Sequence, residues 1–118
     1  MDYVLTENHR TEFPNPLILQ KGENVIVGNK SSPEWPDWVF CEKTDGSNSG
    51  WVPKNIINVI IPQGANRGFI TENYTARELD IDKGALVEAL KEFGGWCFVR
   101  NKTSNEEGWV PKKILSEI

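Results

Sequence analysis

The sequence is poor in the residues from which catalytic and metal sites are built. Its 118 residues include one histidine, His9, and two cysteines, Cys41 and Cys97. A structural zinc site needs about four Cys or His ligands. A nucleophilic enzyme needs a nucleophile, a base and an orienting group, and no such combination or Gly-rich phosphate loop stands out. These absences predict a protein without catalytic residues, metal or cofactor.

Positive charge and long apolar runs are also lacking. The net charge is -4, with residues 1–61 contributing -3 and residues 62–118 contributing -1. Nucleic acids and anionic membranes are bound through basic surfaces, so neither is expected as the main partner. No apolar run approaches the ~20 residues of a membrane span. The start, Met1-Asp2-Tyr3, does not resemble a secretory signal. If Met1 is the native start, we expect a cytoplasmic protein with free, buried thiols.

What the sequence does contain is an internal repeat. Gly50-Trp51-Val52-Pro53-Lys54 recurs as Gly108-Trp109-Val110-Pro111-Lys112, and Thr6-Glu7-Asn8 recurs as Thr71-Glu72-Asn73. Trp38 precedes Gly50 by the same interval as Trp96 precedes Gly108. The chain is therefore expected to be two copies of one structural unit.

The repeat suggests two sequential domains, one at residues 1–61 and one at 69–118, joined by a short linker at 62–68. Units of about 55–60 residues are near the lower limit for folding alone and need dense cores. Five Trp and five Phe residues can supply such cores.

Each copy reads as short strands separated by turns rich in Gly, Pro and Asn. In the second copy, strands are expected at 69–71, 79–81, 85–92, 96–101 and 109–110, followed by a helical turn after Pro111. The first copy has the same order, with a helical turn after Pro53. Five short strands per unit predict an all-β fold of two small five-stranded barrels in tandem.

The order of motifs resembles the Src-homology-3 (SH3) family. In the second copy the family's segments correspond to Ile70–Tyr74, Glu78–Gly84, Gly95-Trp96 and Gly108–Pro111. In the first copy they correspond to His9, Leu17–Gly22, Trp38 and Gly50–Pro53. The resemblance covers nearly the whole chain.

The resemblance implies binding of proline-rich segments in the polyproline II conformation, held in slots between aromatic rings. Its implied slot residues in the second copy are Tyr74, Trp96, Trp109 and Pro111, and in the first copy His9, Trp38, Trp51 and Pro53. Acidic residues that pair with a ligand Arg or Lys would be Glu12 and Glu78.

The chain departs from the family pattern at several ring positions. Ile56 and Ile114 stand where the family has a groove Tyr, and the loop after Tyr74 is about three residues shorter than usual. Four ligand classes therefore stay open: a proline-containing peptide, a different peptide, a protein surface, or a cell-wall glycopeptide. A structural alternative is that the aromatic faces pack against each other or against a homodimer mate.

Overall fold

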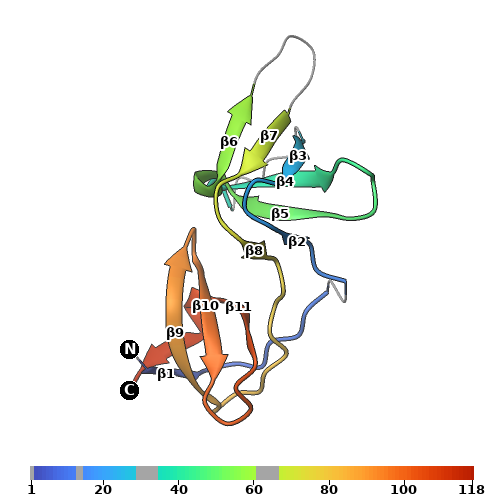
Figure 1. Ribbon diagram of the computed structural model, residues 1–118. Coiled ribbons are helices and arrows are strands. Elements are labelled where there is room, and N and C mark those ends of the chain that lie inside the picture. Colours follow the sequence, from blue (N-terminus) through green and yellow to red (C-terminus); the bar gives the residue numbers. More distant parts are fainter. Residues whose placement is uncertain (1, 13–14, 29–34, 61–66) are drawn as a thin grey trace. The chain divides into compact units, whose positions relative to one another are not determined.

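The structure is a computed structural model that describes residues 2–12, 15–28, 35–60 and 67–118. Within these ranges its regular secondary structure consists of strands and two short 3₁₀ turns (Figure 1). The strands are β1 (Asp2–Leu5), β2 (Ile18–Leu19), β3 (Asn24–Val27), β4 (Trp38–Lys43), β5 (Ser49–Pro53), β6 (Ile57–Ile60), β7 (Arg67–Ile70), β8 (Tyr74–Thr75), β9 (Leu86–Phe93), β10 (Trp96–Asn101), β11 (Glu107–Pro111) and β12 (Leu115–Glu117). No helix among these residues is long and apolar enough to cross a membrane.

Two five-stranded antiparallel sheets carry the fold. One has the order β11-β10-β9-β1-β12 and the other β5-β4-β3-β7-β6. The 3₁₀ turns η1 (Lys54–Ile56) and η2 (Lys112–Ile114) follow Pro53 and Pro111, as the repeated motif predicts. The prediction of an all-β protein with two five-stranded units is confirmed.

The first strand of each sheet comes from the other copy of the repeat. β1 of the first copy pairs with β9 and β12 of the second, whereas β7 of the second pairs with β3 and β6 of the first. The chain accordingly divides into unit 1, residues 1–15 with 77–118, and unit 2, residues 16–76. Unit 2 is thus continuous in sequence and inserted into unit 1.

The compact units differ in this respect from the sequential division 1–61, 62–68 and 69–118. Arg67 and Gly68, expected in a linker, lie in β7, and residues 61–66 fall outside the described ranges. Because Ile60 and Arg67 are Cα partners in one sheet, the segment between them joins two strands of unit 2. The chain passes from one unit to the other at 15–16 and again at 76–77.

The segments that follow the two first strands are alike: Thr6-Glu7-Asn8 follows β1 and Thr71-Glu72-Asn73 follows β7. The Thr6 amide donates to the Ile114 carbonyl and the Thr71 amide to the Ile56 carbonyl, each at 2.8 Å. The side-chain oxygens of Asn8 and Asn73 accept from the amides of Lys83 and Lys21, at 2.7 and 2.8 Å. The flanks of the two first strands thus carry the same hydrogen-bonding groups. The strands themselves differ, because Gly68 of β7 stands where β1 has Tyr3, and a Cβ at Gly68 would lie 2.8 Å from Cγ2 of Ile57.

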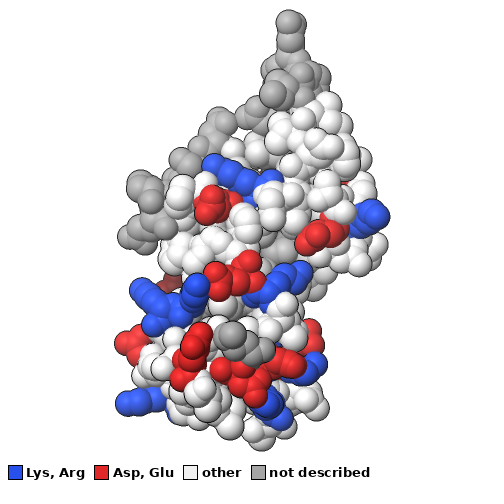
Figure 2. Space-filling model, turned by 90° about the vertical axis from the view of Figure 1, so that its left-hand side faces the viewer, with Lys and Arg blue, Asp and Glu red and all other residues white. Residues whose placement is uncertain are grey.

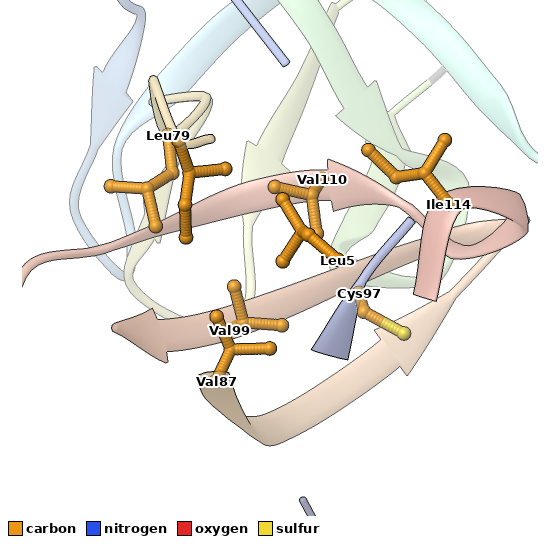
Figure 3. Close-up of a cluster of buried hydrophobic side chains, with 8 residues drawn as sticks. Leu5, Leu79, Val87, Cys97, Val99, Val110 and Ile114 are labelled. Carbon is orange, nitrogen blue, oxygen red and sulfur yellow. The ribbon is translucent and has the colours of Figure 1, made fainter. Parts of the chain in front are cut away.

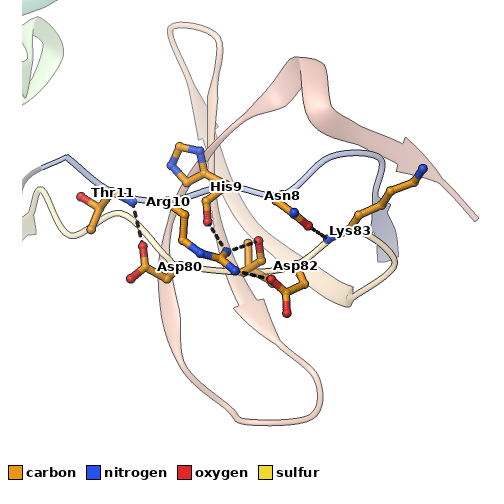
Figure 4. Close-up of polar contacts among 8 residues, drawn as sticks. Asn8, His9, Arg10, Thr11, Asp80, Asp82 and Lys83 are labelled. Atoms are coloured by element: carbon orange, nitrogen blue, oxygen red, sulfur yellow. Dashed lines mark hydrogen bonds and ion pairs between the residues drawn. The ribbon is translucent and has the colours of Figure 1, made fainter.

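The residues that follow each first strand, here called a loop arm (6–12 after β1 and 71–76 after β7), also pair with residues of the other copy. The His9 amide donates to the Ile81 carbonyl at 2.8 Å, and the Ile81 amide returns a bond to His9 at 2.9 Å. The Thr11 amide donates to Asp80, and Arg10 pairs with Asp82 (Figure 4). In unit 2, β2 and β8 pair in the equivalent place.

The core of unit 1 shows the exchange at the level of side chains. Leu5, from β1, is 1% exposed and lies among residues of the second copy (Figure 3). The others are Leu79, Ile81, Val87, Cys97, Val99, Val110 and Ile114. Both thiols are free and buried, as predicted. Burial disfavours the charged thiolate and raises the pKa of Cys41 to about 11.

Two local expectations need correction. Leu79–Ile81 was expected to be a strand but makes only isolated bridges, at Glu78 and Ile81. Tyr74–Thr75 was expected in a loop but forms β8, because Leu19 and Ile18 of the other copy offer it a pairing edge. The predicted strand at 85–92 is confirmed as β9.

Candidate peptide-binding site

In unit 1, His9 and Trp96 form an aromatic pair. Their ring centroids are 6.0 Å apart at an interplanar angle of 76°, an edge-to-face arrangement. Nε2 of His9 lies 2.9 Å from Oε1 of Glu78. Both side chains are partly buried, 14% exposed for His9 and 16% for Glu78. The carboxylate therefore holds the imidazole in place beside the indole.

Local structure brings these side chains together. Trp96 opens β10 directly after the Gly94-Gly95 turn, where both glycines have positive φ. Pro111 is the Cα partner of Trp96 on β11. His9 comes in on the loop arm that pairs with Ile81. A partly buried Trp, a partly buried Pro and an imidazole therefore line one site.

Trp109 and Ile114, two other expected slot residues of this unit, are almost fully buried. Trp109 is 4% exposed and packs edge-to-face on Phe98 with centroids 5.3 Å apart. Its backbone joins the chain around Glu78: its amide donates to the Arg77 carbonyl and its carbonyl accepts from the Leu79 amide. Ile114 is 4% exposed and belongs to the core. Trp109 and Ile114 therefore expose little surface to a ligand.

Unit 2 has an equivalent set of residues, of which Trp38 and Pro53 are more buried than their counterparts Trp96 and Pro111, whereas Trp51 is less buried than Trp109. Trp38 is 6% exposed, Tyr74 8% and Ile56 6%, and Pro53 is also buried. The Tyr74 hydroxyl donates to the carbonyl of Trp51 at 2.9 Å. Trp51 is partly buried and packs edge-to-face on Phe40 at 5.4 Å. The rings of unit 2 thus make contacts within their own unit.

The grouping of the expected site residues follows the exchange. The resemblance placed His9 with Trp38, Trp51 and Pro53, but His9 lies with Trp96 and Glu78. It placed Tyr74 with Trp96, but Tyr74 bonds to Trp51. Each unit contains the residue types predicted for a slot, but His9 and Tyr74 each lie in the unit opposite to the one that the resemblance implied. The sequence feature that could have indicated this exchange is the unusually short loop after Tyr74.

The acidic residues of the loop arms have separate roles. Glu78 is bonded to His9, whereas Glu12 is exposed. Asp80 and Asp82, which were not predicted as site residues, hold the other arm through Thr11 and Arg10. Figure 2 shows acidic and basic side chains interspersed on the face drawn, with no broad basic surface among its described residues. The described residues contain no group of three or more His, Cys, Asp or Glu arranged to hold a metal.

Comparison with protein families agrees with the repeated fold. Residues 3–60 match a family described as variant SH3 domain, and residues 72–112 match the SH3 domain family. No curated protein and no solved structure matched the chain.

The chain belongs to the SH3 family, with two copies in tandem. SH3 domains are in general non-catalytic modules of protein interaction. The family matches follow the order of the sequence, whereas the compact units exchange their first strands.

Proposed function

We propose that this chain is a non-catalytic binding protein that captures an extended, proline-containing segment at the site of unit 1. The arrangement of Trp96 against His9 and opposite Pro111 carries this proposal. Rigid rings accept the ridges of a polyproline II helix at low entropic cost, and the indole N–H can donate to a ligand carbonyl that this helix leaves unpaired.

The two units are proposed to differ in role. Trp96 keeps part of its surface exposed, whereas its counterpart Trp38 is 6% exposed and its unit's Tyr74 is bonded to the Trp51 backbone. Unit 1 is therefore the proposed ligand site. The burial of Trp38 and Tyr74 favours the structural alternative in unit 2, in which aromatic side chains stabilise the fold.

A titration of the nitrogen-15-labelled chain with a proline-rich peptide tests the function. The Trp96 indole signal should shift and saturate, while that of Trp38 should stay in place. Trp96→Ala should weaken binding at least tenfold, about 1.4 kcal/mol, because the ring forms one wall of the slot. Leu90→Ala is a matched control, since Leu90 is 41% exposed on the same unit and outside the site.

The result decides between ligand classes. If the Trp96 indole responds only to cell-wall glycopeptide fragments, the proline preference is wrong but the site stands. If it responds to neither ligand, the aromatic rings of unit 1 are structural, and the proposal fails.

A further inference from the structure

The two halves of the sequence complete each other's sheets. β1 is a central strand with β9 on one side and β12 on the other, and both neighbours come from residues 67–118. β7 is likewise central between β3 and β6, and both come from residues 1–60. Without the other half, each half would leave a gap of one strand in its sheet.

We propose that residues 1–60 and 67–118 are specific binding partners, each inserting its first strand and loop arm into the other. Their association would then not depend on the covalent connection at 61–66. The interaction surface on each half is the pair of strand edges flanking the gap. Its occupant is the equivalent segment of the other half, 2–12 or 67–76.

The inserted segments make contacts of the kind that stabilise a permanent interface. Leu5 and Ile70 are 1% and 0% exposed, so each contributes a fully buried side chain to the opposite half. Each strand exchanges backbone hydrogen bonds along both edges. Each loop arm adds more, such as the reciprocal bonds of His9 with Ile81 in unit 1. Separating the halves would expose all of these groups at once.

The connecting segments explain why exchange is favoured over two sequential domains. The contacts of Thr6 and Asn8 are repeated by Thr71 and Asn73, so these flanking contacts do not discriminate between the two arrangements. A sequential second domain would require the chain to reverse within the short loop after Tyr74. In the exchanged arrangement the chain continues past Tyr74 without reversing, and the Ala76 amide donates to the Leu17 carbonyl at 2.8 Å. Short connections that cannot close in place are a recognised cause of segment exchange.

Cutting the chain within residues 61–66 tests the proposal without any ligand. A protease site replaces Gln63-Gly64-Ala65 in the full-length protein, and the uncut variant is first shown to keep the amide spectrum of the parent. After complete cleavage, the two fragments should elute together at the volume of the uncut chain. Native mass spectrometry should give the mass of the pair, and denaturant should release both. Two separately eluting fragments would overturn the proposal.

A second measurement uses the uncut chain and does not depend on cleavage. His9→Ala should move the Trp96 indole signal and leave that of Trp38 nearly unchanged, because the imidazole lies against Trp96. The opposite response would mean that each half folds on itself. Neither result depends on peptide binding, so failure of the proposed function and failure of this inference are distinguishable.

Discussion

At the scale of single residues, equivalent positions of the repeat do not carry equal constraints. Gly108 and Gly50 occupy the same place in the repeated motif. A Cβ on Gly108 would lie 2.8 Å from the backbone nitrogen of Leu79 and 3.0 Å from its Cβ. The three atoms nearest to a Cβ on Gly50 would all belong to the Leu17 side chain, the closest being its Cβ at 3.1 Å. The Gly at 108 is needed because backbone passes directly against it, a contact that the motif itself does not reveal.

Gly108→Ala is therefore expected to destabilise unit 1 by about 1–3 kcal/mol, the usual cost of forcing atoms into a packed site. Gly50→Ala is its matched control and should cost unit 2 less, since its closest contact would be 3.1 Å, against 2.8 Å at Gly108. Urea unfolding followed through amide signals of each unit measures both. An equal or larger loss for Gly50→Ala would contradict the expectation.

At the scale of elements, β1 and β7 each stabilise the unit whose other sheet strands come from the opposite copy of the repeat. Leu5 lies in the core with Val87, Val99 and Val110. Ile70 is fully buried on β7, next to β3 and β6. A mutation in one half of the sequence should therefore be felt in strands of the other half.

Leu5→Ala should lower the stability of unit 1 by about 2–5 kcal/mol, because a large buried side chain leaves a cavity. Amide exchange should accelerate in β9, β10 and β11 and remain slow in β3, β4 and β5. Ile70→Ala is the reciprocal variant and should give the reverse pattern. If Leu5→Ala loosens β3–β5 instead, then β1 belongs to its own half in solution.

At the scale of the whole molecule, the chain is an SH3-type unit with a second one inserted between residues 15 and 77. The inserted unit begins at β2 and ends with β7 and β8, so its first strand stands at its carboxyl end. The order of strands along the chain differs from that of a sequential SH3 domain, while the set of strands in the sheet is the same.

Residues 16–76 are therefore expected to fold by themselves. Their amide spectrum should overlay on the unit 2 signals of the full chain, and they should unfold cooperatively. About 60 residues is close to the lower limit for an autonomous domain, so reduced stability is expected. Residues 1–61 serve as the comparison, because they lack β7. A folded 1–61 fragment beside an unfolded 16–76 fragment would contradict this division.

Much of this protein was determined by local sequence alone. The repeated Gly-Trp-Val-Pro-Lys motif, the alternation in Trp96–Val99 and the turns at Gly22 and Gly84 each encode structure within a few residues, so strands, turns and family could be predicted. Which first strand enters which sheet could not, because the contacts that flank β1 and β7 are equivalent and the close approach of Ile57 and Asn58 to Gly68 is visible only in the structure. Only the tertiary structure decided that His9 meets Trp96 and Tyr74 meets Trp51. The physical reason is that this choice depends on the chain connections between distant elements, such as the short loop after Tyr74, and not on local propensity.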